Sequence, residues 1–238
     1  YHLMRAHTAV YDMIKAMPGG DKVQVGLVKN IFQFDPLHRW NLFHWILCRV
    51  LHGAYNESIL GYLETGTFRC KVPTQANFVR KHPEDVGKTD FIGLNYYANL
   101  ILSLFMKREP PFEPHARKGQ FLTDMPYAVY AEGFYRALIR LKPLGVPVIV
   151  TENGIADDKD DKRALWIERY IYAMSEAIKD GVDVRGYHYW SLMDNFEWAE
   201  GWQMSFGLYK VDRETQSRTL REGSLAYRDI IEAQKNGN

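Results

Sequence analysis

Short apolar segments alternate with helical segments along the chain, and this alternation constrains the fold more than any other feature of the sequence. Segments typical of strands cover residues 22–30, 90–97, 146–154 and 184–195. Segments with helical periodicity or helix-start signals cover residues 1–17, 36–52, 126–142, 163–179 and 222–235. Such alternation favours parallel strands that are joined by right-handed crossovers, so we expect an α/β fold with a parallel sheet.

Four strands are too few to close a (β/α)8 barrel, which needs eight. We expect residues 53–89 to be irregular because glycine and proline interrupt them. We also expect a long loop over residues 98–125 and a hairpin over residues 205–220. Because four strands cannot close a barrel, we expect them to form either an open sheet or half of a barrel.

Polar and aromatic residues follow the apolar strand segments at their carboxyl ends, where α/β sheets place their functional sites. Asn95 and Tyr97 end one segment, and Glu152 directly follows the apolar run of another. The chain is 14% aromatic. Flat rings beside carboxylates and amides suit a sugar ligand, because sugar C–H faces stack on rings and sugar hydroxyls need hydrogen-bond partners.

Each of these residues has a structural interpretation beside the functional one. Glu152 is either a carboxylate that a rigid strand delivers into a site or a residue that caps a turn, since Asn153-Gly154 favours turns. The Tyr97 hydroxyl either holds a neighbouring carboxylate or is structural. Trp190 and Trp198 expose a large apolar area unless they pack into a corner or stack on a ligand.

Charge and composition argue against several classes of function. The 30 Lys and Arg residues balance the 29 Asp and Glu residues, so we expect neither nucleic acid nor a membrane as a partner. No apolar run approaches the roughly 20 residues of a membrane span. The cysteines and histidines lack metal-ligand spacing, and no GxGxxG or P-loop motif occurs, so we expect no metal and no cofactor. Two unpatterned cysteines and no evident secretion signal favour a cytoplasmic location.

Four strings of residues together closely resemble the C-terminal half of glycoside hydrolase family 1, the β-glucosidase family. They are FIGLNYY at residues 91–97, VIVTENG at 148–154, GYHYWSLMDNFEW at 186–198 and FGLY at 206–209. Their order and separation are highly specific for that family. The resemblance implies a (β/α)8 TIM barrel fold, of which this chain, residues 1–238, carries about strands five to eight as a single half-barrel.

The resemblance also implies a role for each candidate residue. Glu152 matches the catalytic nucleophile of a retaining β-glycosidase, which hydrolyses O-glycosidic bonds by double displacement. Tyr97 is similar to the tyrosine that hydrogen-bonds this nucleophile. The residues that would hold the sugar are Asn95, Trp190, Glu197, Trp198 and Phe206.

The family carries its general acid and base in an Asn-Glu-Pro string after the fourth barrel strand, and no such string occurs here. The chain begins at Tyr1 within a helical segment, so we expect a piece of a longer protein. One interpretation is the nucleophile half of a β-glycosidase that works with a missing N-terminal half-barrel. The alternatives are a catalytically incomplete half-barrel that acts as a sugar-binding or assembly module, and a homodimer of two half-barrels. A β-glycoside or monosaccharide is the expected ligand.

Overall fold

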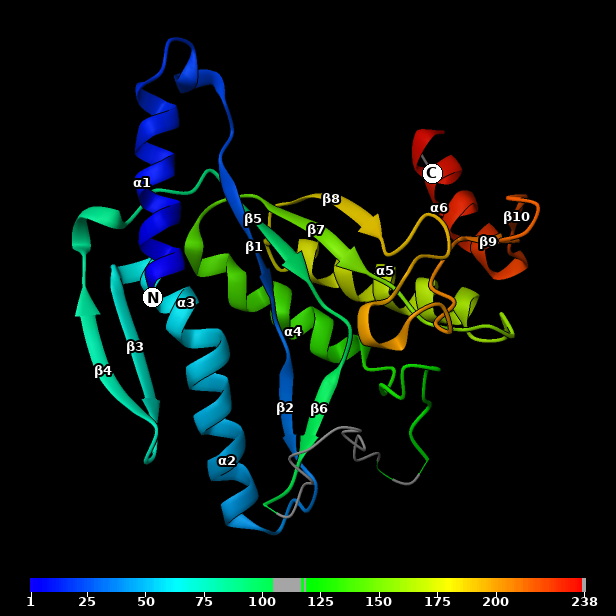
Figure 1. Cartoon of the computed structure of the whole chain (residues 1–238), viewed down its shortest axis with the longest axis horizontal. Coiled ribbons are helices and arrows are strands. Elements are labelled where there is room, and N and C mark those ends of the chain that lie inside the picture. Colours follow the sequence, from blue (N-terminus) through cyan, green and yellow to red (C-terminus); the bar gives the residue numbers. More distant parts are fainter. Residues whose placement is uncertain (105–116, 118, 237–238) are drawn as a thin grey trace.

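A parallel four-stranded sheet forms the centre of the molecule (Figure 1). The computed structural model describes residues 1–104, 117 and 119–236. The sheet contains, in chain order, β1 (Gly26–Asn30), β5 (Phe91–Asn95), β7 (Val148–Asn153) and β8 (Val184–Tyr189). All three pairings between neighbouring strands are parallel, which confirms the α/β fold with a parallel sheet.

Helices connect successive strands of this sheet. They are α2 (Leu42–His52) and α3 (Ser58–Thr65) between β1 and β5, α4 (Ala131–Leu141) between β5 and β7, and α5 (Arg163–Lys179) between β7 and β8. Ile92 and Leu94 of β5 are fully buried, in one core cluster with Phe134 of α4 and Ile167 of α5. Alternate strand residues therefore point to the helices.

The opposite face of the sheet is partly exposed among the residues that the structure describes. A Cβ atom placed on Gly93 would lie 2.8 Å from Val28 and 3.0 Å from Thr151, so these residues share that face. The Val28 side chain is 54% exposed although it is apolar. In the part of the chain that the structure describes, β1 and β8 each pair with one strand of this sheet, so the sheet does not close.

Residues 53–89 are ordered into elements, so the expectation that they are irregular is wrong. They form the π-helix η2 (Gly53–Glu57), α3, the hairpin of β3 (Thr67–Val72) and β4 (Ala76–Lys81), and the 3-10 helix η3 (Pro83–Asp85). Gly66 ends α3 with a φ of 67°, a left-handed conformation that glycine adopts readily. Gly53, Gly66, Pro73 and Pro83 therefore stand at the ends of elements, whereas Gly61 lies inside α3.

Two short strands and two helix starts also differ from the sequence expectation. β2 (Gln33–Pro36) pairs in parallel with β6 (Asn99–Leu102). Pro36 therefore ends a strand, and α2 begins only at Leu42 instead of at residue 36. In the same way α4 begins at Ala131 rather than at residue 126, and β8 ends at Tyr189 rather than at residue 195. Much of the expected loop over 98–125, namely residues 105–116 and 118, lies outside the described residues.

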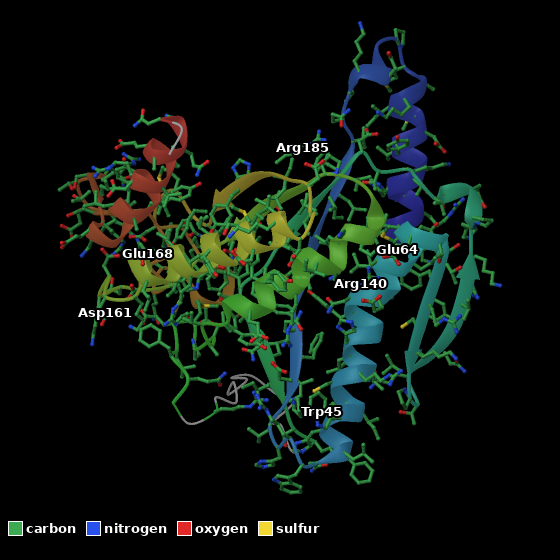
Figure 2. The ribbon with its side chains drawn as sticks, turned by 180° about the vertical axis from the view of Figure 1, so that it is seen from behind. Trp45, Glu64, Arg140, Asp161, Glu168 and Arg185 are labelled. Carbon is green, nitrogen blue, oxygen red and sulfur yellow. The ribbon has the colours of Figure 1, made fainter. Side chains whose placement is uncertain are left out.

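The remaining elements frame the sheet. They are α1 (His2–Ala16), the 3-10 helices η1 (Gly20–Lys22), η4 (Lys142–Leu144), η5 (Trp198–Glu200) and η6 (Glu222–Ser224), the antiparallel strands β9 (Tyr209–Val211) and β10 (Arg218–Leu220), and α6 (Leu225–Lys235). The hairpin expected over residues 205–220 is therefore confirmed. Arg140 of α4 joins Glu64 of α3 at 2.5 Å and Glu57 at 2.6 Å on the helical side of the molecule, as Figure 2 shows for Glu64.

Candidate functional site

Asn95 and Glu152 lie side by side at the carboxyl ends of β5 and β7. The register between these strands shifts after Leu94, so that Thr151 is an extra residue in β7. The Thr151 hydroxyl donates a hydrogen bond of 2.6 Å to the Asn95 side-chain oxygen. A bulge re-aims the side chains of a strand end, and here it lets two consecutive residues of β7 face the end of β5.

Glu152 is held by Tyr97, which follows β5. The Tyr97 hydroxyl donates a hydrogen bond of 2.8 Å to Oε2 of Glu152. Burial raises the pKa of Tyr97 well above its usual value, and the negative charge of Glu152 raises it further. Tyr97 therefore stays protonated at neutral pH and remains a donor to the carboxylate. This contact differs from the turn-capping alternative, in which the carboxylate would accept from backbone amides.

Asn153 and Gly154 join the end of β7 to both neighbouring strands. The buried Asn153 amide donates to the Tyr96 carbonyl, and the Tyr187 hydroxyl donates to Asn153 Oδ1 at 2.9 Å. Gly154 is packed so tightly that a Cβ atom would lie 1.7 Å from the Trp190 carbonyl oxygen. The Asn-Gly pair therefore holds Glu152 in a rigid strand end.

The segment after β8 is organised by its own side chains. The Ser191 hydroxyl donates to Asn195 Oδ1 at 3.2 Å, and the Asn195 amide donates to Glu197 Oε2 at 2.9 Å. Trp190 is half-buried and Trp198 is 82% exposed. Glu197 is thus oriented by a relay within the segment, while the Trp198 ring stays accessible.

Asp194 ties the same segment to the loop that contains Phe206. Its Oδ1 accepts the Gly207 amide at 2.9 Å, and its Oδ2 accepts Arg221 Nη2 at 2.9 Å. Phe206 is 3% exposed, and its ring lies edge-on to Tyr97 with 6.2 Å between the ring centroids. The loops after β5, β7 and β8 therefore meet at Tyr97, Glu152 and Phe206.

Comparison with known proteins identifies the family of this arrangement. A family model described as "Glycosyl hydrolase family 1" matches residues 1–236. The chain belongs to glycosyl hydrolase family 1. It is 32% identical to a β-galactosidase of Sulfolobus acidocaldarius over 97% of this chain and 46% of that protein. It is 29% identical to β-glucosidase A of Thermotoga maritima over 97% of this chain and 55% of that protein.

Solved family 1 structures match the fold as well. A β-glycosidase from Pyrococcus horikoshii is 33% identical with a TM-score of 0.79, over 96% of this chain and 51% of that chain. The β-glucosidase from Thermotoga maritima in complex with glucoimidazole is 28% identical with a TM-score of 0.77, over 97% and 55%. These neighbours have a TIM barrel fold. This family 1 chain spans about half the length of the curated relatives it matches, and its sheet is open.

The predicted site residues of this family 1 chain are brought together to different degrees. Tyr97, Glu152 and Phe206 form one contact group. Asn95 reaches this group through Thr151. The charge of Glu197 also acts on Tyr97 and raises its pKa, after burial and the charge of Glu152.

Tyr127 is a further residue near the site that no sequence motif singles out. Burial raises the pKa of Tyr127 first, and the charges of Glu197 and Glu200 raise it further. Tyr127 also acts electrostatically on Tyr97. The sequence predicts Tyr127 within a helix over residues 126–142, whereas it lies in the stretch before α4, which begins at Ala131.

Over residues 1–104, 117 and 119–236, no three His, Cys, Asp or Glu side chains are grouped so that they could hold a metal ion. Within the same residues, no helix has the length and apolar character needed to cross a membrane. Cys48 and Cys70 are both free thiols.

Proposed function

We propose that this chain is the nucleophile-bearing half of a retaining β-glycosidase, with β1, β5, β7 and β8 as strands five to eight of its barrel. The hydrogen bond from Tyr97 to Glu152 at the carboxyl edge of the sheet is the observation that carries this proposal. Active sites of (β/α)8 enzymes lie at this edge. Membership in glycosyl hydrolase family 1 supports the reaction class.

In the proposed reaction, Glu152 attacks the anomeric carbon of a β-glycoside. A C–O bond forms to the carboxylate while the bond to the leaving oxygen breaks and gives its electron pair to that oxygen. A second carboxyl group, supplied from outside this chain's strands, protonates the leaving oxygen. Water then attacks the anomeric carbon, loses its proton to that second group and releases Glu152. Two inversions at one carbon retain its configuration.

Each neighbouring residue has a task in this scheme. Tyr97 keeps its proton because its pKa is raised, so it can fix one oxygen of Glu152 while the other faces the sugar. Glu197, oriented by Asn195, would accept hydrogen bonds from sugar hydroxyls. The remaining proposed sugar contacts are Asn95, Trp190, Trp198 and Phe206.

The charge of Glu197 favours a neutral glycone. A phosphorylated sugar would bring two negative groups together, which disfavours binding. The names of the relatives, β-galactosidase and β-glucosidase, indicate neutral hexosides as well. We therefore propose a neutral β-hexoside as the substrate class.

The open face of the sheet favours a second candidate function. Val28 is an exposed apolar residue on the face opposite the helices, and β1 and β8 have unpaired edges in the described residues. A half-barrel of this kind could bind sugar and assemble with another half without turnover of its own. The two candidates differ in whether Glu152 forms a covalent bond to a sugar.

The test is covalent trapping by 2,4-dinitrophenyl 2-deoxy-2-fluoro-β-D-glucoside. Its leaving group needs no general acid, so the reagent tests the nucleophile in this chain alone. We expect a single sugar adduct on the peptide that contains Glu152, seen by mass spectrometry after proteolysis. Glu152→Gln should abolish the adduct, and Glu168→Gln on the exposed side of α5 should leave it unchanged. A chain that binds glucoimidazole but forms no adduct supports the second candidate.

A further inference from the structure

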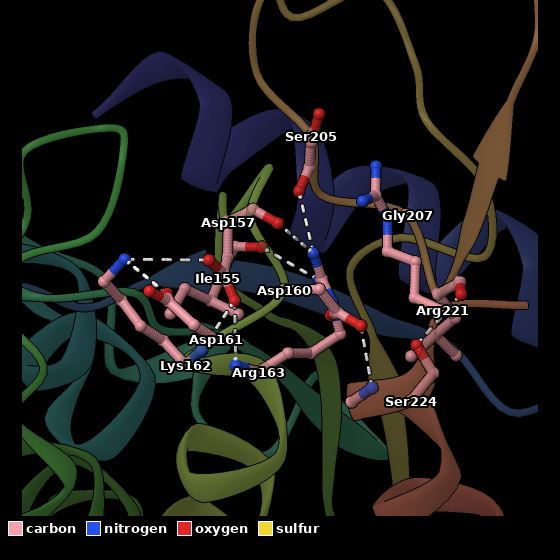
Figure 3. A network of polar contacts seen from close by, with 12 residues as sticks. Ile155, Asp157, Asp160, Asp161, Lys162, Arg163, Ser205, Gly207, Arg221 and Ser224 are labelled. Atoms are coloured by element: carbon pink, nitrogen blue, oxygen red, sulfur yellow. Dashed lines mark hydrogen bonds and ion pairs between the residues drawn. The ribbon is translucent and has the colours of Figure 1, made fainter.

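Arg163 is a fully buried cation at the first position of α5, and its guanidinium faces the loops after β7 and β8 (Figure 3). Nε donates to Asp160 Oδ1 at 2.7 Å, and Nη1 donates to the Tyr189 hydroxyl at 2.6 Å. The guanidinium also donates to four backbone carbonyls, those of Ile155 at 3.2 Å, Asp157 at 2.8 Å, Ser205 at 3.1 Å and Phe206 at 3.1 Å.

These acceptors belong to two loops that are distant in sequence. Ile155 and Asp157 follow the strand that carries Glu152, whereas Ser205 and Phe206 follow the segment of the two tryptophans. The loops also bond to each other, because the Asp157 amide donates to the Ser205 carbonyl at 3.1 Å. Arg163 therefore joins the two loops. We call its guanidinium, together with the backbone carbonyls that it binds in both loops, the clamp.

Arg163 reaches the proposed site through the Phe206 backbone and through the Tyr189 side chain. The Phe206 carbonyl accepts from Arg163, while the Phe206 ring lies edge-on to Tyr97, the donor to Glu152. The Tyr189 hydroxyl belongs to the residue directly before Trp190. Arg163 thus bonds the Phe206 backbone directly and reaches Trp190 through the residue before it.

The clamp keeps its charge although it is buried. Burial lowers the pKa of the Arg163 guanidinium, but Tyr189 and the hydrogen bond to Asp160 outweigh this effect, and the pKa lies above its usual value. Asp160 is itself fixed, since its Oδ2 accepts the Gly223 amide at 2.7 Å. Charge-assisted bonds of this kind are the stronger class of hydrogen bond.

We propose that Arg163 is a positioning residue that sets the place of Phe206 relative to Glu152 and so determines the affinity for the glycone. The inference rests on the proposed function, because it assigns Phe206 to the sugar site. A planar guanidinium presents five donors in a fixed fork, whereas a lysine ammonium is a single point with three donors. Lysine at this position keeps the charge but cannot bridge both loops.

The experiment compares Arg163→Lys with Arg140→Lys in the full chain. Arg140 is the matched control because it also bridges two elements by several bonds, to Glu57 and Glu64, on the helical side of the fold. The first readout is the affinity for glucoimidazole by calorimetry. Arg163→Lys should weaken it by about ten-fold or more, because displaced positioning groups cost on that order, whereas Arg140→Lys should leave it unchanged. Where the chain turns over an aryl glucoside, Arg163→Lys should raise KM more than it lowers kcat.

The second readout does not depend on sugar binding. Hydrogen exchange should accelerate at the amides of Asp157 and Ser191, which donate to the Ser205 and Phe206 carbonyls, in Arg163→Lys but not in Arg140→Lys. If the wild-type chain binds no glucoimidazole, the proposed function is wrong, and hydrogen exchange alone then tests whether Arg163 holds the two loops together. Unchanged exchange, or unchanged affinity in a folded Arg163→Lys chain, overturns the inference. If Arg163→Lys does not fold, Tyr189→Phe replaces it, and unchanged affinity and exchange there overturn the inference equally.

Discussion

The Tyr97 hydroxyl lies 2.8 Å from Oε2 of Glu152 and joins the residue that follows β5 to the end of β7. Thr151 and Asn95 form a second bond between the same strand ends at 2.6 Å. The first bond fixes the Glu152 carboxylate, and the second holds the end of β7 against the end of β5. In the proposed reaction this places a carboxylate of constant orientation at the open edge of the sheet.

Removal of the Tyr97 hydroxyl should impair turnover. A hydrogen bond to a charged group contributes about 1.5–3 kcal/mol, so Tyr97→Phe should lower kcat for an activated aryl glucoside by about 10- to 150-fold. The control is Tyr11→Phe, which removes a similar bond of 2.9 Å from a tyrosine to Asp90, at the opposite end of the sheet strands. An equal loss in both variants would show that Tyr97 acts on stability rather than on Glu152.

A methyl group at Gly154 should separate the ends of β7 and β8. The added Cβ would lie 1.7 Å from the Trp190 carbonyl oxygen, which is backbone and cannot rotate away. Overpacking costs about 1–3 kcal/mol or more, so Gly154→Ala should lower Tm by several degrees in a thermal scan. Gly53→Ala is the control, since no atom lies within 4 Å of its added Cβ, and its Tm should not fall.

The parallel sheet could be predicted from the sequence because short apolar segments alternate with helical segments along the chain, which is typical of parallel strands joined by crossovers. The hairpin of β3 and β4 is not predicted: TFRCKV of β3 alternates polar and apolar residues, but ANFVRK of β4 does not, and the glycines and prolines around both favour an irregular segment. Pro36 shows the same limit. A proline is compatible both with a strand end and with a helix start. Only the pairing of Pro36 with Leu102 of β6 shows that Pro36 ends a strand.

The candidate site could be predicted where its residues sit in contiguous strings at strand ends. Glu152 and Tyr97 are close in space because β5 and β7 pair, which the alternation of elements already suggests. Tyr127 and Arg163 could not be predicted in the same way. Tyr127 lies in the stretch before α4, where no motif marks it, and Arg163 bonds to backbone carbonyls that are distant in sequence and leave no pattern in the residue types.

Replacement of Lys29 should stabilise the chain in a pH-dependent way. Lys29 in β1 is 5% exposed, its Nζ lies 3.8 Å from the centre of the Tyr55 ring, and burial lowers its pKa to about 8. The pKa of Lys29 is lower in the folded chain than in the unfolded chain. Between these two pKa values the unfolded chain binds more protons, so the free energy of unfolding rises with pH there.

Lys29→Met removes the buried ammonium group and so the cost of burying its charge. The free energy of unfolding of Lys29→Met minus that of wild type should therefore be about 2–3 kcal/mol larger at about pH 6 than at about pH 10. Denaturant titrations at the two pH values measure the difference. A constant difference between the two proteins at both pH values would contradict the titration of Lys29 in this range.

The open sheet face should make the isolated chain self-associate. Val28 is 54% exposed on edge strand β1, and unpaired strand edges with apolar side chains are templates for association. Val28→Lys places a charge on this edge and should shift the sedimentation velocity distribution toward monomer. Val86→Lys is the matched control, because Val86 is 45% exposed but follows η3 outside the sheet. A wild-type chain that sediments as a compact monomer at all concentrations, or a Val86→Lys chain that dissociates as readily as Val28→Lys, would show that the sheet edge does not drive association.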